Sequence, residues 1–473
     1  MPRLGGRSAA LVVLLGVSGL ALGCDTLVDP ATPCLTPKVG RSSVRSNTNN
    51  VLSAIVSAEV HGADSVAVRF GRTTAPTDIY TPAVGSLNGE VAIPLFGLYP
   101  GADYSLQVMA FSTCGHSIGE VLAYTTHQLS MDLPAYTASG TDPSPGYVAF
   151  ASRSFGIVID NTGRVVWYHR FPDGPGLNFQ PQPNGRYAAR PSPATPGDLA
   201  LWTEIDPLGD VTRTLGCARG LQPRFHDLLA QPDGSYWLLC DQPRTVNLTA
   251  AGGPAQQLVL GTGIQHQSAA GEVLFEWTPF DHFEVDLQAL EPADRTGPMI
   301  NWTHGNALDL DTDGNLLVSF RNLSEVTKIN TRNGAVMWRM GGSRNQFTFV
   351  NTTAPAFARQ HSIRATGAGQ FLLLDNLGNT LGSRAERYEY DEARRIVRAS
   401  GSHASSTGAV AQTGGSTQSL PGGRTLVSFG SGGSVEEYDA EGNVVWRIEG
   451  NPGYVFRAHR IRSLYQPGVG DPR

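Results

Sequence analysis

Three histidines recur at equivalent places in consecutive repeats of the C-terminal part of the chain: His226, His304 and His361. Each stands eight to ten residues before the glycine of a turn, so a repeated fold would bring the three imidazoles to one place. A neutral imidazole can attack as a nucleophile, and another can donate or accept a proton. Because the chain holds only 11 histidines, chance is a poor explanation. The pattern predicts a catalytic site where three histidines converge.

Other residues stand in register with these histidines. Asn178 occupies the same place in the preceding repeat and, less clearly, Thr417 in a later one. Arg321 directly follows an apolar strand in the repeat of His304, so we expect it near the same mouth, with a surface ion pair as the alternative. Three histidines could also hold zinc, but no carboxylate or cysteine stands in register, so no metal is expected.

The elements that must position these residues form an internal repeat over residues 146–465. Each copy has a turn glycine, an apolar strand, an Asp or Asn near a Gly and, in most copies, Val-x-Trp. Six copies of about 53 residues each are near the period of propeller blades. A sheet this small cannot bury both of its faces alone, whereas radial stacking covers them. We therefore expect an all-β six-bladed propeller, closed by the C-terminal strand pairing into an early blade.

One repeat is longer than the others. The turn glycines at positions 185, 234, 314, 369 and 423 are 49, 80, 55 and 54 residues apart. The outlier indicates an insertion, Asp281–Met299, in the third unit. We expect a short helix near its start and a loop that could cap one end of the propeller channel.

The residues before the repeat indicate a second domain. Residues 35–127 contain short runs of alternating apolar and polar residues, which predict a small β-sandwich of the fibronectin or immunoglobulin type. The run from Leu98 to Val108 resembles the corner where a tyrosine hydroxyl bonds back to the backbone. Residues 128–145 are rich in Pro, Ser, Thr and Gly and are expected to be a linker.

The N-terminus indicates export. Residues 1–23 read as a signal peptide, with arginines before an apolar stretch that is too short to span a membrane comfortably. A small residue followed by Cys24 predicts a lipoprotein signal, a lipid on Cys24 and a tether over residues 24–34. An ordinary secretory signal is the alternative. Either way, the mature chain leaves the cytoplasm, and a lipid would hold it on the bacterial membrane facing the periplasm or the cell exterior.

Cysteine count and charge agree with an exported protein. If Cys24 carries lipid, four of the five cysteines remain, an even number for an oxidising compartment. Of three possible pairings we expect Cys34–Cys114 and Cys217–Cys240. The net charge of −6, without a basic run, argues against nucleic acid as a partner.

The histidine-bearing repeats resemble a known family. The carrying motifs are Asn301-Trp302-Thr303-His304-Gly305-Asn306-Ala307, the run from Gly314 through Arg321 to Val326, Trp338-Arg339-Met340-Gly341-Gly342, Gln360-His361-Ser362 and Leu374-Asp375-Asn376. They are similar to the bacterial arylsulfotransferases (aryl-sulfate sulfotransferases). The resemblance implies a six-bladed propeller with an N-terminal β-domain.

The resemblance also implies an activity. The family moves a sulfuryl group from a phenolic sulfate ester to a phenol without a nucleotide sulfate donor such as PAPS, and this chain has no P-loop. It implies His361 as the nucleophile that becomes a sulfohistidine, with His226 or His304 as the acid. Arg321 and Asn306 would bind sulfate oxygens. No cofactor is implied, and the partners would be a phenolic sulfate donor and a phenolic acceptor.

The residues leave two other functions to compare with sulfuryl transfer. A lipid-anchored propeller could instead serve in ligand binding or adhesion without catalysis, but such a module has no need of three inward imidazoles with an arginine. A formylglycine sulfatase is disfavoured because the chain has no Cys-x-Pro-x-Arg motif. The sequence leaves a homodimer open.

Overall fold

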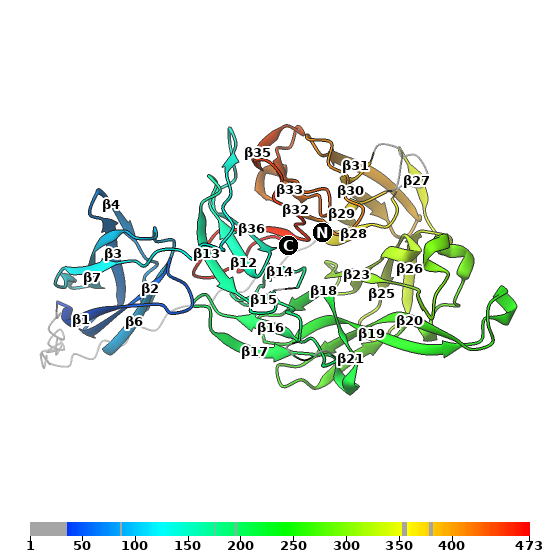
Figure 1. The fold of residues 1–473 in the computed structure, drawn as a ribbon, viewed down its shortest axis with the longest axis horizontal. Coiled ribbons are helices and arrows are strands. Elements are labelled where there is room, and N and C mark those ends of the chain that lie inside the picture. Colours follow the sequence, from blue (N-terminus) through cyan, green and yellow to red (C-terminus); the bar gives the residue numbers. More distant parts are fainter. Residues whose placement is uncertain are drawn as a thin grey trace, which may run out of the picture.

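The computed structural model describes residues 36–85, 88–174, 176–193, 195, 197–351, 357–377 and 382–473. Within these ranges the regular structure is all β, joined by short 3-10 turns, with no α-helix. The same residues include no helix long and apolar enough to cross a membrane. Their strands form two sheets in the N-terminal part and six sheets around a common centre in the C-terminal part (Figure 1).

The two N-terminal sheets share one apolar core, in which Val56 and Ile93 of one sheet meet Val68 and Leu106 of the other. The hydroxyl of Tyr104 accepts a hydrogen bond from the backbone N–H of Tyr99 at 2.7 Å, the local bond expected at this corner. One sheet runs β1 (Lys38–Ser46), β2 (Ala54–His61), β6 (Gly89–Leu95). The other runs β4 (Ala75–Tyr80), β3 (Ser65–Arg72), β7 (Asp103–Ser112), β8 (Gly115–Ile118), with β5 (Val84–Gly85) on β3 and β9 (Leu122–Thr125) on β7.

The first three C-terminal sheets are built mainly from antiparallel pairs of consecutive strands. The first contains β36 (Ala458–Ile461), β11 (Tyr147–Ser152), β12 (Phe155–Ile159) and β13 (Val165–Arg170). The second contains β14 (Phe179–Pro181), β15 (Tyr187–Ala189), β16 (Trp202–Ile205) and β17 (Val211–Leu215). The third contains β18 (Pro223–Ala230), β19 (Tyr236–Val246), β20 (Gln257–Gln267) and β21 (Val273–Trp277), with β22 (Met299–Asn301) parallel to β20.

The other three sheets complete the ring. Their turns use the repeat glycines, as at Gly314, whose φ of +78° favours glycine. The fourth sheet contains β23 (Gly305–Leu310), β24 (Leu316–Phe320), β25 (Glu325–Ile329) and β26 (Val336–Gly341). The fifth contains β28 (His361–Gly367), β29 (Gln370–Asp375), β30 (Arg384–Asp391) and β31 (Ile396–Ala404), with β27 (Thr348–Val350) parallel to β31. The sixth contains β32 (Ser416–Ser419), β33 (Thr425–Ser428), β34 (Val435–Tyr438), β35 (Val444–Ile448) and β10 (Ala138–Ser139).

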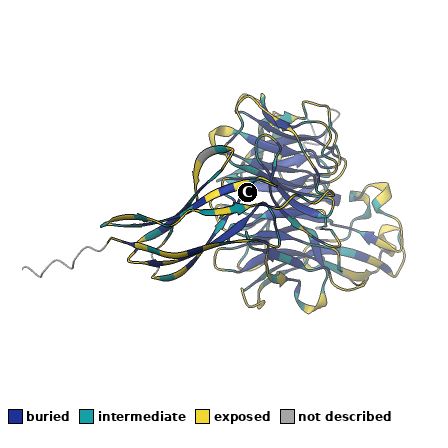
Figure 2. Ribbon diagram, turned by 60° about the vertical axis from the view of Figure 1, so that its left-hand side comes forward, coloured by how far each residue is buried: buried dark blue, intermediate teal, exposed yellow. Residues whose placement is uncertain are grey.

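Strands from both ends of the C-terminal part close the ring. β36 pairs with β11, so the chain's end completes the first sheet, as the repeat pattern predicts. β10 pairs with β35, so the start of this part completes the sixth sheet. The stretch 128–145, expected to be only a linker, therefore supplies an edge strand. Figure 2 shows buried residues concentrated within the six sheets and exposed residues in the loops and at the outer edges.

The tryptophans of the repeat join neighbouring sheets. Trp167, Trp277 and Trp446 lie in β13, β21 and β35 and are almost completely buried. The indole N–H of each donates to a backbone carbonyl in a turn of the next sheet. The acceptors are the carbonyls of Pro207 at 2.8 Å, Gly334 at 3.1 Å and Asn161 at 2.9 Å, respectively. The Trp446 bond links the sixth sheet to the first. The tryptophan of the Val-x-Trp repeat is thus buried in the core and also links its sheet to the next one.

The insertion differs from its prediction. In place of a short helix, residues 279–301 form the isolated 3-10 turns η3 (Pro279–Asp281), η4 (Leu287–Ala289) and η5 (Pro292–Asp294), followed by β22. Phe280 and Phe283 pack against Trp302, and this packing favours an irregular course over a helix. Part of the extra length lies elsewhere, in the long β19–β20 hairpin with η2 (Thr249–Ala251). The remaining 3-10 turns are η1 (Ala218–Gly220), η6 (Arg321–Leu323) and η7 (Pro421–Gly423).

Several predictions concern residues that the structure does not describe. The signal peptide over residues 1–23, Cys24 and the tether lie outside the described residues. Cys34 lies there too, so the Cys34–Cys114 pair cannot be described. The second expected pair, Cys217–Cys240, is a disulfide that ties the residue before η1 to β19.

Candidate active site

The structure brings His226, His304 and His361 together at the centre of the six sheets. His226 lies in β18, His304 directly before β23, and His361 is the first residue of β28. The Nε2 atoms of His226 and His304 are 3.2 Å apart. The ring centroid of His226 lies 4.9 Å from that of His304 and 6.5 Å from that of His361. The three imidazoles therefore come from three neighbouring sheets.

The backbone at this cluster is held in an uncommon conformation. His304, Arg359 and Ser362 have φ values of +47°, +53° and +60°, in the left-handed region that residues with a Cβ rarely adopt. Such strain persists only where the surroundings fix it. Here the carbonyl of His304 accepts from the N–H of Arg321 at 3.1 Å, and Arg359 donates to Ser324 Oγ at 3.1 Å. Residues in such conformations cluster at active sites, so the backbone geometry agrees with a functional site here.

Asn376 fixes the orientation of the His361 ring. Its Nδ2 donates to the carbonyls of Ala411 at 2.8 Å and Gly414 at 2.9 Å, so its Oδ1 must face the imidazole. That oxygen lies 2.8 Å from Nδ1 of His361 and accepts the Nδ1 proton. The neutral ring therefore keeps its lone pair on Nε2, the atom that a nucleophilic histidine would use.

The protein environment also keeps the His361 ring neutral. Burial is the largest effect and lowers its pKa, while the hydrogen bond with Asn376 opposes the shift. The charges of Arg321 and Arg457 lower the pKa further, to about 3. At neutral pH, the His361 imidazole is therefore unprotonated.

His226 and His304 form a second unit. Asn301 donates from Nδ2 to Nδ1 of His304 at 2.7 Å, so the neutral His304 ring carries its proton on Nε2 and points it at Nε2 of His226. Burial lowers the pKa of both rings well below the ordinary value, and the nearby charge of Arg224 lowers both further. In the protein as described, both rings are therefore neutral and share one hydrogen bond.

Arg321 is the first residue of η6 and lies at the same centre. It is largely buried, and its Nη1 donates to Oδ1 of Asn322 at 2.8 Å. No carboxylate among the described residues forms an ion pair with it. Burial, followed by the charge of Arg359, lowers its pKa to about 10, so it stays charged at neutral pH. Its unneutralised charge suits an anionic ligand.

Asn306 forms hydrogen bonds with two residues next to the histidine cluster, Gln360 and Arg457. Its Nδ2 donates at 2.7 Å to the carbonyl of Gln360, the residue before His361. Its own carbonyl accepts from Nη2 of Arg457 at 3.0 Å. One amide N–H of Asn306 thus positions the peptide bond that leads into His361.

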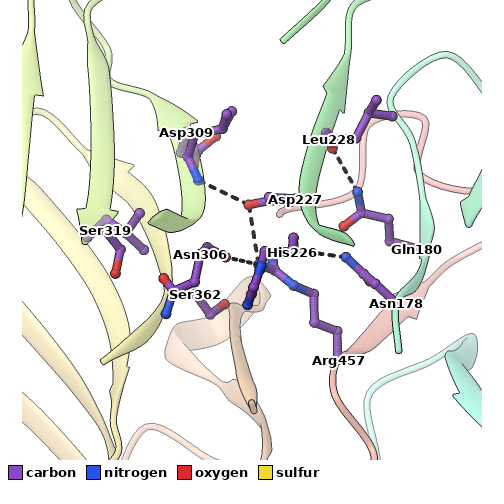
Figure 3. Close-up of polar contacts among 12 residues, drawn as sticks. Asn178, Gln180, His226, Asp227, Leu228, Asn306, Asp309, Ser319, Ser362 and Arg457 are labelled. Carbon is purple, nitrogen blue, oxygen red and sulfur yellow. Dashed lines mark hydrogen bonds and ion pairs between the residues drawn. The ribbon is translucent and has the colours of Figure 1, made fainter. Parts of the chain in front are cut away.

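The inner strands of neighbouring sheets are joined by side chains (Figure 3). Asn178 donates to the carbonyl of His226 at 3.0 Å, and the backbone N–H of Thr417 donates to Ser362 Oγ at 3.2 Å. Asp227 accepts from the N–H of Leu308 at 3.1 Å, and Asp309 accepts from Ala365 at 3.0 Å. The residues predicted in register with the histidines are thus part of the links that set the positions of the imidazoles.

Sequence reasoning missed two kinds of residue. Asn376 lies within a motif that carries the family resemblance, but the sequence does not indicate that its side chain faces His361. Asp227 and Arg457 form a buried ion pair at 3.3 Å between strands far apart along the chain. The described residues include no cluster of three or more His, Cys, Asp or Glu side chains placed to hold a metal ion.

Residues 222–451 match the family model described as Arylsulfotransferase (ASST). This part of the chain is similar to the arylsulfotransferase family. The match covers the strands from β18 to β35 and includes all three histidines, Arg321 and Asn306. The resemblance found in the sequence is thereby confirmed, and the arylsulfotransferase region contains the histidine cluster.

The other comparisons add less about this arylsulfotransferase region. A search of curated protein sequences gives no match. Among solved structures, the chain is similar to a protein of unknown function from Bacteroides caccae, with 16% identity over 68% of this chain and 100% of that chain and a TM-score of 0.43. It is also similar to a streptogramin B lyase (13%, 67% and 84%, TM-score 0.37) and to an inactive virginiamycin B lyase from Staphylococcus aureus (9%, 65% and 87%, TM-score 0.35). At these values the structural similarities say nothing about function.

Proposed function

We propose that this protein is an aryl-sulfate sulfotransferase that works without a nucleotide sulfate donor such as PAPS. It would take a sulfuryl group from a phenolic sulfate ester, hold it on His361 and pass it to a second phenol. The observation that carries the proposal is the hydrogen bond from Nδ1 of His361 to Asn376, which leaves the lone pair on Nε2 beside two further imidazoles. The family match over residues 222–451 supports the reaction class.

In the first half-reaction, Nε2 of His361 attacks sulfur while the bond between sulfur and the phenolic oxygen breaks. The sulfuryl group becomes a sulfohistidine, and the bonding electrons leave with the phenolate. By analogy with phosphoryl transfer, the transition state is loose and its charge lies on the peripheral oxygens. Arg321, which has no carboxylate partner among the described residues, can stabilise that charge.

His226 and His304 are proposed to donate a proton to the leaving phenolate and to accept one from the acceptor phenol. Both are neutral before the donor binds, because burial and nearby arginines lower their pKa values. The negative charge of the bound ester favours uptake of one proton by the pair. One imidazolium then gives that proton to the departing phenolate, whose pKa near 10 makes it a ready acceptor. The acceptor phenol returns a proton to the same pair in the second half-reaction.

We further propose the architecture that positions this site. The six C-terminal sheets would be the blades of a propeller over about residues 146–465, completed by β10. The two N-terminal sheets, over residues 35–127, would be a sandwich domain that holds the propeller away from its anchor.

For localisation, we propose that Cys24 carries a lipid that anchors the protein to a bacterial membrane after export. Cys24→Ser is expected to move the protein from the membrane fraction to the soluble fraction after cell fractionation. An unchanged distribution would refute the lipid anchor without touching the proposed activity.

One assay tests the activity most simply. Pure protein is mixed with p-nitrophenyl sulfate, with and without phenol, and nitrophenolate release is followed together with phenyl sulfate formation. We expect steady turnover that depends on phenol and one phenyl sulfate for each nitrophenolate. Release at the same rate without phenol would indicate a hydrolase, and no release in either condition would overturn the proposal.

A further inference from the structure

Arg457 stands directly before β36 and is almost completely buried beside the histidine cluster (Figure 3). Its Nη2 contacts the carbonyl of Asn306 at 3.0 Å and Oδ2 of Asp227 at 3.3 Å. Its Nε and Nη1 have no hydrogen-bond partner among the described residues. A buried guanidinium whose N–H groups are unmatched is costly, so such groups are normally matched by a ligand or water.

The charges around Arg457 do not balance. Asp227 is shared by Arg364 at 3.0 Å, Arg457 at 3.3 Å and Arg473 at 3.7 Å, and Arg473 also contacts Asp309 at 3.1 Å. Three guanidiniums thus meet two carboxylates, which leaves this cluster positive.

The ionisation of the central pair agrees with this count. Burial raises the pKa of Asp227, but the three arginines outweigh burial and bring it to about 2. Burial lowers the pKa of Arg457 to about 9, so both groups are charged at neutral pH. Asp227 and Arg457 therefore remain an ion pair at neutral pH.

The segment that carries Arg457 lies against the proposed nucleophile. The neighbouring Phe456 has its ring centroid 6.2 Å from that of His361 and 5.8 Å from that of His226. The charge of Arg457 acts on both imidazoles, lowering the pKa of each, and Arg321 acts on His361 in the same way. The nucleophile is therefore within the field of two arginines.

We propose that Arg457 is a second sulfuryl-binding residue, which donates from Nε and Nη1 to the oxygens of the group transferred to His361. This inference rests on the proposed function and extends it, because the sequence assigned sulfate binding to Arg321 and Asn306 only. Arg457 lies outside the matched family region, which ends at residue 451. A guanidinium anchored through Nη2 presents its other donors without a further loss of conformational freedom, which suits binding of a tetrahedral oxyanion.

The test measures binding of inorganic sulfate by isothermal titration calorimetry to the full-length protein and to variants. Arg457→Gln is expected to weaken sulfate binding by about 10- to 100-fold, and Arg457→Lys, which keeps the charge but not the fork of donors, by an intermediate amount. Arg473→Gln is the matched control, since it removes a positive charge from the same cluster but no unpartnered donor, and it is expected to bind sulfate nearly as the wild type does. Circular dichroism and thermal unfolding check that each variant is folded; if Arg457→Gln does not fold, Arg457→Lys carries the comparison.

Three results would overturn the inference: no sulfate binding by the wild type, unchanged binding by Arg457→Gln and Arg457→Lys, or equal losses in the Arg457 and Arg473 variants. The last result would mean that Arg457 acts only through its general charge and that water matches its N–H groups. Failure of the proposed function looks different, because the wild type would bind sulfate through Arg457 but release no nitrophenolate. Conversely, the wild type could turn over substrate while the Arg457 variants keep the same kcat/KM. That result would refute the role of Arg457 in sulfuryl binding but not the proposed sulfotransferase activity.

Discussion

The reactivity proposed for His361 depends on one amide. Asn376 is buried, and its two Nδ2 contacts to loop carbonyls determine which way its Oδ1 points. The same oxygen holds the Nδ1 proton of the imidazole and therefore decides which ring nitrogen is nucleophilic. This arrangement resembles the way in which outer partners fix histidine ligands in metal sites.

Asn376→Ala is expected to lower kcat by about 10- to 100-fold with p-nitrophenyl sulfate and phenol, because the ring loses the partner that fixes its tautomer. KM should change much less, since Asn376 does not contact the substrate in the proposed mechanism. Asn345→Ala is the control: it removes side-chain bonds to the backbone at Gly341 and Phe347, away from the imidazoles. Equal losses in both variants would mean that Asn376 only supports its loop.

At the scale of the strand and the sheet, the repeated tryptophan makes two contributions that can be separated. Trp446 and Trp338 occupy equivalent places in their sheets, and both are fully buried. The N–H of Trp446 donates to the carbonyl of Asn161 in the first sheet, whereas the N–H of Trp338 has no partner among the described residues. The pair thus offers a direct comparison between packing with and without a link to the next sheet.

Trp446→Phe is expected to lower the free energy of unfolding by about 1 kcal/mol more than Trp338→Phe does. Both changes lose similar apolar contacts, but only the first breaks a hydrogen bond and leaves a carbonyl unmatched. Chemical denaturation of the two variants and the wild type measures the difference. If Trp338→Phe is the more damaging change, the indole bond does not hold the sixth sheet to the first.

The sequence could predict those features that recur. Turn glycines and Val-x-Trp repeat with the sheets, so they mark the units, and a histidine at the same place in three units must meet the others near the centre. The insertion was predicted wrongly as helical because packing of Phe280 and Phe283 on Trp302 overrides local preference. Arg457 could not be predicted, because its role depends on ring closure, which brings it to Asp227 from more than 200 residues away.

At the scale of the whole molecule, folding of the six sheets buries four histidines in their neutral form. His226, His304, His361 and His459 are deeply buried, and burial is the largest cause of the lowered pKa of each. In the unfolded chain each would have a pKa near 6.5. Below that pH the unfolded state binds protons that the folded state does not, so stability depends on pH.

The free energy of unfolding is therefore expected to fall as the pH drops below 6.5, and for His361 the loss continues towards pH 3. Each such histidine contributes a slope of about 1.4 kcal/mol per pH unit within its window. Denaturant titrations between pH 7.5 and about pH 4.5 measure the slope. His459→Gln should reduce it by about one histidine's share. A slope unaffected by His459→Gln would mean that this group is not neutral in the folded protein.

The covalent intermediate on His361 is the central claim, and one measurement tests it most directly. The protein is mixed with p-nitrophenyl sulfate alone, without acceptor, and its intact mass and peptide masses are determined. One added SO₃ is predicted, on the peptide that contains His361, and phenol should remove it with formation of phenyl sulfate. His361→Ala should take up no label under the same conditions. A label on His226 or His304, or turnover by the wild type with no label on any histidine, would contradict the account.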